Sequence, residues 1–301
     1  MSLNDDLGKR MKEYYEQVPK FRLYRRTPVA IRIDGKAFHS FTRGFQKPFD
    51  EVLIKAMQRT MRYLCENIQG CVLGYHQSDE ITLILTDYKK LTSCAWFDYE
   101  VQKICSISAS MATMTFNKFF EEEVNAWDTQ NGISCIGYHN EDKDPGLVKL
   151  HDTYWAACNQ GAMFDARCFN IPKEEVTNLI YWRQLDATRN SIQMVGQANF
   201  SHKQLQNKSC NQIQDMLMTE RCLNWNDLPG YQKRGSCCIK SDVACTFAKE
   251  ENGIVITGAT ERPHWYIDND IPIFKGEGRE YIEKLINFDN TASNKVVLMN
   301  L

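Results

Sequence analysis

Two acidic clusters beside strand-like apolar runs are the residues of this chain best suited to chemistry. Asp34 follows the run 29–33. Asp79 and Glu80 precede the run 81–85, and a helix-like segment separates the two clusters. This order can bring the carboxylates together beside one sheet, where they would repel each other unless cations were bound. Mg²⁺ held by carboxylates and phosphates is the commonest reason for such a site, although ordinary turn acids facing solvent remain an alternative.

Several residues near these acids could hold a nucleotide. Gly35 allows close approach of the backbone to a ligand, and its carbonyl oxygen could complete a metal shell. Lys47 lies on a loop that leads into a helix N-terminus, where anions are favoured, so it is a candidate triphosphate ligand. Ser78 could add a hydroxyl contact, and His39 follows Gly35 closely. A solvated lysine and a structural histidine are the alternatives for Lys47 and His39.

Two basic clusters could contact the backbone of RNA, because phosphate contacts provide most non-specific affinity. The second cluster lies beside Tyr231, and aromatic residues within the first could stack on bases. Solvated protein faces are the alternative for both. The first cluster comprises Lys9, Arg10, Lys12, Lys20, Arg22, Arg25 and Arg26, and the second comprises Lys233 and Arg234.

Composition excludes several classes of protein. With 301 residues, 43% of them hydrophobic and 25% charged, the chain can bury a sizeable core and is not expected to be disordered. The formal charge of −2 gives no global attraction to nucleic acid. The 12 cysteines are scattered without zinc spacing, which favours reduced thiols in a cytoplasmic protein. The polar N-terminus predicts no secretory signal, and no apolar run approaches membrane-spanning length.

Hydrophobic periodicity and breaker residues predict the elements that position these side chains. The polar stretch 125–159 is expected to be an irregular insertion or loop, and short strands and turns are expected after residue 235. Asp50 is a plausible N-cap for the second helix. Helices are expected over 5–16, 50–67, 95–122, 172–198 and 209–219, and strands over 29–33, 71–75, 81–85 and 162–171.

The order of these elements predicts an α+β fold with an antiparallel sheet and helices on one face. Strand–helix–strand–strand–helix–strand is the order of a ferredoxin-like unit. Acids at the end of its first strand and in its central hairpin give the palm-like arrangement of nucleotidyl-transfer enzymes. We expect a catalytic domain over residues 1–240 and a C-terminal extension over 241–301 that packs on the same unit.

Six short motifs also occur in a fixed order along the chain. Together, over roughly residues 3–240, they closely resemble the tRNA-His guanylyltransferase superfamily, the 3′→5′ nucleotide polymerases. The resemblance implies a palm-like catalytic domain, two Mg²⁺ ions, and ATP, GTP or other nucleoside triphosphates as substrates. The motifs are Arg32–His39, Lys47–Asp50, Gln77–Glu80, Phe164–Arg167, Tyr181–Asp186 and Arg234–Gly235.

The resemblance further implies roles for individual acids. Asp34 and Asp79 match metal-binding aspartates, and Gly35 matches a ligand that uses its backbone carbonyl. Glu80 matches a neighbour of the second aspartate, and we group it with Asp34 and Asp79 as catalytic. These individual roles are implied by the resemblance alone.

Nucleotide contacts follow from the same resemblance, whereas the RNA contacts are predicted from basic residues of the chain. His39, Lys47, Asp50 and Ser78 are expected to line the pocket of the incoming nucleotide. The predicted RNA contacts come from three separate parts of the chain. They are Lys9, Arg10, Lys12, Arg183, Lys233 and Arg234.

The implied reaction starts with activation of a tRNA 5′-monophosphate by ATP or GTP, after which the 3′-hydroxyl of an incoming nucleotide attacks the activated 5′ end. One stretch departs from the family. Members specific for tRNA-His carry a His-Ile-Asn-Asn-Leu-Tyr-Asn run, where this chain has Thr188–Met194 and keeps only Asn190. The departure and the N-terminal run Leu7–Lys12 favour the guanylyltransferase-like branch, which repairs truncated tRNA 5′ ends with the opposite strand as template. Family resemblance also implies a homotetramer.

Other functions remain open at this point. Untemplated addition of guanosine to tRNA-His is the nearest alternative. A palm-fold nucleotide cyclase would use the same acids to turn a nucleotide's own 3′-hydroxyl on its α-phosphate. A non-catalytic tRNA-binding protein is a third possibility, which the retained acids Asp34, Asp79 and Glu80 argue against because unused clustered carboxylates destabilise a fold.

Overall fold

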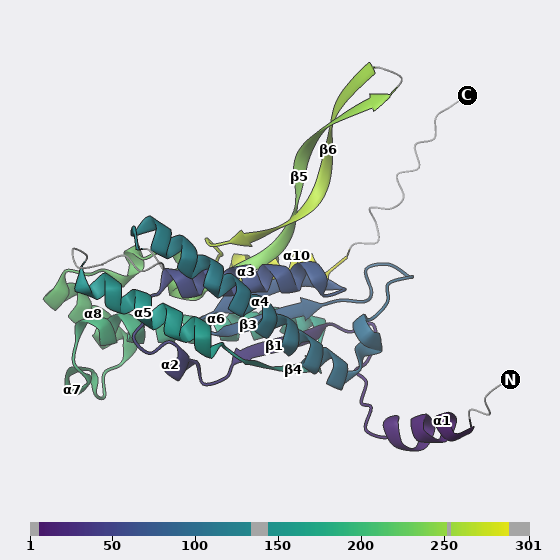
Figure 1. Cartoon of the computed structure of the whole chain (residues 1–301), viewed down its shortest axis with the longest axis horizontal. Coiled ribbons are helices and arrows are strands. Elements are labelled where there is room, and N and C mark those ends of the chain that lie inside the picture. Colours follow the sequence, from purple (N-terminus) through teal and green to yellow (C-terminus); the bar gives the residue numbers. More distant parts are fainter. Residues whose placement is uncertain (1–5, 134–143, 252–253, 289–301) are drawn as a thin grey trace.

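The computed structural model describes residues 6–133, 144–251 and 254–288, and Figure 1 shows one sheet with helices packed around it. The sheet has six strands in the order β4-β1-β3-β2-β5-β6, and every neighbouring pair is antiparallel. The first four positions follow the strand order of a ferredoxin-like unit, as the sequence predicts. The strands are β1 Val29–Gly35, β2 Cys71–Gln77, β3 Glu80–Leu85, β4 Phe164–Asn170, β5 Ser236–Glu251 and β6 Ile254–Asp268.

The register of the central strands places the acids in one row. Asp34 of β1 lies opposite Glu80 of β3 on one side and opposite Asp165 of β4 on the other. Gln77 and Glu80 face each other across the turn that joins β2 to β3. Since directly opposite residues in an antiparallel sheet point to the same face, these side chains share one face at one end of the sheet.

One face of the sheet is covered by α3 Glu51–Asn67, α4 Val101–Gln130 and α5 Pro145–Gln160. Ile31 and Ile33 of β1 pack there with Met57 and Leu64 of α3 and with Phe116 of α4. The periodic apolar stripe of α3 is therefore buried, as the sequence predicts.

The other face is covered by α6 Lys173–Asn199 and α10 Glu280–Ile286. Val176 and Ile180 of α6 and Ile282 of α10 pack with Ala30 and Leu73 of the sheet. The α+β class and the antiparallel palm-like sheet are confirmed, but the helices cover both faces and not one. The second layer exists because α6 carries its own apolar stripe toward the sheet.

The second half of α6 also forms a small core with α8 Cys210–Arg221. Short helices complete the chain, and α1 projects away from the sheet in Figure 1. They are α1 Asp6–Met11, the π-helical turn Lys12–Glu16, α2 Phe38–Phe41, α7 His202–Leu205, α9 Gly230–Arg234, and the 3₁₀ turns Trp96–Tyr99, Trp225–Asp227 and Gly276–Arg279.

Two expected regions are different in the structure. The stretch 125–159 is not a loop where it is described: α4 continues to Gln130 and α5 occupies Pro145–Gln160. The expected short strands after residue 235 are long, since β5 and β6 form a hairpin that extends beyond the sheet (Figure 1). Strand β5 runs through residue 240, so the expected boundary between the two parts of the chain falls inside a strand. The ten cysteines whose side chains the structure describes are free thiols.

Candidate active site

A backbone hydrogen bond brings the two metal-ligand candidates together. The N–H of Gly35 donates to the carbonyl oxygen of Asp79 at 3.2 Å, so the turn after β2 lies against the end of β1. A Cβ on Gly35 would lie 2.2 Å from the ring of Phe38, and so this position requires glycine. Asp34 and Asp79 thus lie beside one another, and the Gly35 carbonyl follows Asp34 directly in the chain.

The electrostatics of these two acids are those of neighbouring, partly buried anions that repel each other. Burial raises the pKa of Asp34, and the carboxylates of Glu80 and Asp165 raise it further. Burial also raises the pKa of Asp79, and Asp34 adds to that shift. Both carboxylates would be stabilised by a bound cation.

The donor set fits Mg²⁺. Within the described residues no group of three or more His, Cys, Asp or Glu side chains could hold a metal. Mg²⁺ does not need such a cage, because it is usually bound by one or two carboxylates and keeps its remaining positions for water and substrate phosphates. Asp34, Asp79 and the carbonyl of Gly35 provide oxygen ligands of that kind.

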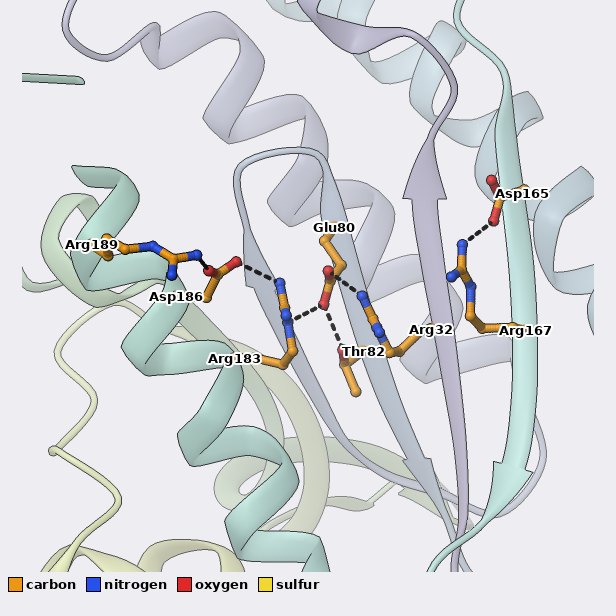
Figure 2. Close-up of polar contacts among 8 residues, drawn as sticks. All are labelled: Arg32, Glu80, Thr82, Asp165, Arg167, Arg183, Asp186 and Arg189. Carbon is orange, nitrogen blue, oxygen red and sulfur yellow. Dashed lines mark hydrogen bonds and ion pairs between the residues drawn. The ribbon is translucent and has the colours of Figure 1, made fainter. Parts of the chain in front are cut away.

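Glu80 differs from the other two acids because its carboxylate is already neutralised by arginines (Figure 2). Oε2 accepts from Arg32 Nη2 at 2.8 Å, and Oε1 lies 2.7 Å from Arg183 Nε. Thr82 also donates its hydroxyl to Oε1 at 3.3 Å. The side chain of Glu80 is only 5% exposed, and its contacts fix the residue that directly follows the turn of Ser78 and Asp79. Its predicted catalytic role stays a prediction.

The arginine contacts continue along α6. Arg183 also donates to Asp186 at 2.9 Å, and Asp186 pairs with Arg189 (Figure 2). The guanidinium groups of Arg32 and Arg183 lie 5.5 Å and 4.5 Å from the ring centre of Trp182. The prediction that Arg183 contacts RNA stays a prediction. In this structure its side chain is 8% exposed, because that face of α6 packs on the sheet.

A single pocket collects the residues predicted to hold a nucleotide, which we call the nucleotide pocket. His39, Lys47, Asp50, Ser78 and Asp79 all line it. Lys47 is exposed, and the structure gives its ammonium no ion-pair partner among the described residues. Its charge is thus available to phosphates beside the two aspartates.

The side chains of Asp50 and His39, which also line that pocket, already have contacts within the protein. Asp50 caps α3 by accepting from the N–H of Leu53 at 2.9 Å, and its other oxygen accepts from Gln46 N–H and from the hydroxyl of Tyr154. Burial raises its pKa. The exposed His39 has Nε2 3.1 Å from the hydroxyl of Ser40. Asp50 therefore has a demonstrated structural function at the pocket wall.

Sequence reasoning missed the residue that shapes the turn. His76 is buried, and its Nε2 lies 2.9 Å from the carbonyl oxygen of Ser78. A carbonyl only accepts, so Nε2 carries the proton and donates it. This bond supports Ser78, whose φ of 52° is left-handed. The sequence holds one signal for the contacts between Glu80 and its arginines: Arg32 is the only charged residue in the otherwise apolar run 29–33.

The remaining RNA-binding candidates lie on exposed or half-exposed positions. Lys9, Arg10 and Lys12 are all exposed on the projecting N-terminal helix and the turn after it. Lys233 donates from Nζ to the carbonyl of Asn226 at 2.5 Å, while the carbonyl of Arg234 accepts from Tyr75. Neither group lies among the residues that line the nucleotide pocket.

Comparison with solved structures relates this arrangement to nucleotide-binding proteins. A bacterial tRNA(His) guanylyltransferase (Thg1)-like protein in complex with ATP superimposes with a TM-score of 0.71 and 41% sequence identity, over 94% of this chain and all of that chain. A second such bacterial structure, in complex with GTP, gives a TM-score of 0.67 and 38% identity over 94% of this chain and 99% of the other.

Sequence comparison agrees. A probable tRNA(His) guanylyltransferase of Dictyostelium discoideum is 27% identical, covering 80% of this chain and 86% of that protein. The family described as tRNAHis guanylyltransferase (Thg1) matches residues 8–172, more than half of the chain. With this match, and with the palm-like sheet and its paired aspartates, the chain belongs to the tRNA(His) guanylyltransferase (Thg1) family of nucleotidyltransferases.

Proposed function

We propose that this protein is a Mg²⁺-dependent 3′→5′ nucleotidyltransferase that adds nucleotides to the 5′ end of tRNA and repairs truncated 5′ ends by template. The observation that carries the proposal is that Asp79 belongs both to the acid pair and to the nucleotide pocket of Lys47. A triphosphate bound to Lys47 would therefore lie beside the acids. The ATP and GTP complexes of the bacterial relatives support a nucleotide in such a fold.

Each residue has a defined part in this proposal. Asp34, Asp79 and the Gly35 carbonyl would hold Mg²⁺, which would neutralise phosphate charge and make a hydroxyl a better nucleophile. Lys47 binds the triphosphate as a point charge, and the exposed Ser78 adds a hydroxyl donor. Glu80 keeps the turn of Ser78 and Asp79 in place through its arginine partners.

The proposed reaction uses these parts for positioning and charge neutralisation. An oxygen of the tRNA 5′-monophosphate first attacks the α-phosphorus of ATP or GTP, which forms a 5′–5′ pyrophosphate linkage and releases pyrophosphate. The 3′-hydroxyl oxygen of the incoming nucleotide then attacks the activated 5′-phosphorus, a new P–O bond forms, and the nucleoside monophosphate of the activator leaves. Phosphoryl transfer of this kind needs little covalent help from the protein.

Templated addition is supported by two observations. Identity is 41% with the bacterial Thg1-like protein and 27% with the Dictyostelium protein that bears the guanylyltransferase name. The altered stretch Thr188–Met194 lies in α6, where Asn190 and Met194 line a pocket next to the nucleotide pocket. Untemplated addition of guanosine is the alternative that the experiment below separates.

The assembly and location are also proposals. Family membership supports a homotetramer, and the free thiols of the described cysteines suit a cytoplasmic protein. In the part of the chain that the structure describes, every helix is too short or too polar to cross a bilayer.

The test uses a 5′-monophosphorylated tRNA that lacks its first nucleotide, with Mg²⁺, ATP and each nucleoside triphosphate in turn. Four versions of the tRNA differ only in the base opposite the missing position. Addition of the complementary nucleotide in each version is the expected result. Addition of G to all four versions would establish the untemplated reaction, and cyclic nucleotide without any RNA product would establish the cyclase.

A further inference from the structure

A second pocket adjoins the nucleotide pocket, and nothing in the proposed reaction uses it. It lies between α3, α6, α9 and the end of β2. Asp50, Leu53, Ser78 and Met194 line both pockets, so the two share a wall. We call it the amide pocket, because four carboxamide side chains line it: Gln58, Gln77, Asn190 and Gln232.

The lining of the amide pocket is almost free of charge. Among the described residues that line it, Asp50 and His76 are the only acidic or basic ones. Both carboxylate oxygens of Asp50 already accept hydrogen bonds. Burial lowers the pKa of His76 to about 4, so this ring is neutral at physiological pH. A pocket without a cation does not suit phosphate, which is bound by Arg, Lys or helix N-termini.

Two of its four amide groups, in contrast, have no hydrogen-bond partner among the described residues. Gln77 is 7% exposed, and the described residues supply no hydrogen bond to its side chain. Asn190, half-buried on α6, has no side-chain partner among the described residues either. Among the described residues, neither Gln77 nor Asn190 has a polar side-chain atom that is buried without a partner. Both amides are therefore accessible, and they can bond a ligand or water that enters the pocket.

Two further amides offer only their oxygens. Gln58 donates from Nε2 to Ser236 and Asn269, and Gln232 donates from Nε2 to Glu51 at 2.9 Å. Each keeps a carbonyl oxygen as an acceptor that no described residue uses. The pocket therefore combines whole amides, which both donate and accept, with extra acceptors.

Apolar side chains also line the amide pocket. Apolar side chains lie among the amides: Phe49 from the loop before α3, Leu53 and Ile54 from α3, and Ala187 and Met194 from α6 line the same pocket. An uncharged planar heterocycle with donors and acceptors on its edge matches such a surface, since amides bond base edges and apolar groups cover base faces.

We propose that the amide pocket binds a nucleobase, read at its edge by Gln77 and Asn190. This proposal rests on the proposed function, because that function places nucleotide phosphates in the adjoining pocket. The base can come from a free nucleoside triphosphate or from the end of the RNA. Asn190 and Met194 belong to the stretch in which this chain departs from members specific for tRNA-His, so the departure changes a base-reading surface.

Equilibrium binding measured by titration calorimetry tests this assignment. The variants are Gln77→Leu and Asn190→Leu, which replace each amide with an apolar side chain that has no hydrogen-bonding groups. The matched control is Gln193→Leu, an exposed amide on the same helix that does not line the amide pocket. The probes are ATP, GTP, inorganic tripolyphosphate and a 5′-monophosphorylated tRNA.

Each pocket variant is expected to weaken binding of a base-containing probe about tenfold while tripolyphosphate binds as to the wild type. Loss for ATP or GTP assigns the base to the free nucleotide, and loss for tRNA alone assigns it to the RNA end. Unchanged affinity for every base-containing probe, or equal loss for tripolyphosphate, would overturn the proposal.

Two further measurements keep the result interpretable. Thermal unfolding shows whether Gln77→Leu is folded, and if it is not, the half-buried Asn190→Leu decides the matter. Nucleotide addition by the wild type is measured separately. If the wild type adds no nucleotide but base binding depends on Asn190, the amide pocket stands and the proposed function falls.

Discussion

At the residue scale, the site combines acids with opposite electrostatic environments. Asp34 and Asp79 repel each other and have raised pKa values, whereas Glu80 is buried between Arg32 and Arg183. The first two gain from a bound cation, and the third gains nothing further from one. This division explains how three acids close together in space can serve different purposes.

The buried ion pair leads to a stability prediction. Arg183→Met should lower the free energy of unfolding by about 2–4 kcal/mol, because it leaves Glu80 buried with one arginine fewer. Arg189→Met, at the exposed end of the same chain of contacts, should cost less than about 1 kcal/mol. Urea unfolding of both variants measures the difference. Equal losses of unfolding free energy in the two variants would show that the buried pair of Arg183 and Glu80 stabilises the fold no more than the exposed pair does.

The buried ring of His76 leads to a prediction about pH. Its pKa is about 4 in the fold and 6.5 when free, so between these values the unfolded chain binds a proton that the folded chain does not. Stability from this group is complete above pH 6.5 and falls toward pH 4, by about 3 kcal/mol in all. His76→Gln keeps an N–H for the Ser78 carbonyl and should flatten this slope.

The slope is measured by urea unfolding between pH 4 and 7, a range of about three units around the His76 transition. The exposed His202→Gln is the control and should leave the slope unchanged. A wild-type slope retained in His76→Gln would mean that another group causes it.

The sequence predicts two acids that the structure brings together, Asp34 and Asp79, but not the contacts that hold Glu80 beside them. Asp34 and Asp79 were identifiable because each borders an apolar strand. The ion-pair partner of Arg183 was not identifiable. A helix that packs on a sheet can bury an arginine only where a carboxylate lies close enough to pair with it. Glu80 is that carboxylate, and it lies on a strand far from α6 along the chain, so local spacing cannot reveal the pair.

At the element scale, one residue ties three segments together. Asp50 caps α3, fixes the loop at Gln46 and accepts the hydroxyl of Tyr154 from α5. The wall of the nucleotide pocket therefore depends on a helix cap, and on α5, which the sequence did not predict.

Asp50→Ala should destabilise the protein by about 2–3 kcal/mol, because it removes a cap and leaves the buried Tyr154 hydroxyl without its acceptor. Ser209→Ala removes the exposed cap of α8 and should cost about 1 kcal/mol. Chemical unfolding compares them. If Asp50→Ala lowers the free energy of unfolding no more than Ser209→Ala does, the contacts of Asp50 with the Gln46 loop and with α5 add no stability, which would contradict this account.

The helix α5 was missed for an identifiable reason. The run Asp142–Gly146 is rich in turn-forming residues and predicts a loop. In the fold Asp144 accepts from the N–H of Gly146 as an N-cap, and Pro145 occupies the first turn, where its missing N–H is harmless. The same residues thus begin a helix, and the buried Tyr154 decides between the two outcomes through packing.

At the scale of the whole molecule, the sheet stands between two helical layers and the acids lie at one of its ends. α3 and α4 pack on the strands from one side. From the other side, α6 contributes Arg183, which pairs with Glu80, and part of the wall of the amide pocket. The element order predicted the ferredoxin-like core. It could not predict the second layer or the long β5–β6 hairpin, because both depend on pairing between distant segments.

The most direct test of the account removes one acid at a time and measures single-turnover nucleotide addition to a 5′-truncated tRNA in Mg²⁺. Asp34→Asn and Asp79→Asn should each slow addition by at least about 100-fold. Asp165→Asn, which removes an exposed charge directly opposite Asp34, should slow it by less than about fivefold. Wild-type rates in Asp34→Asn or Asp79→Asn would contradict the claim that this acid pair performs the transfer.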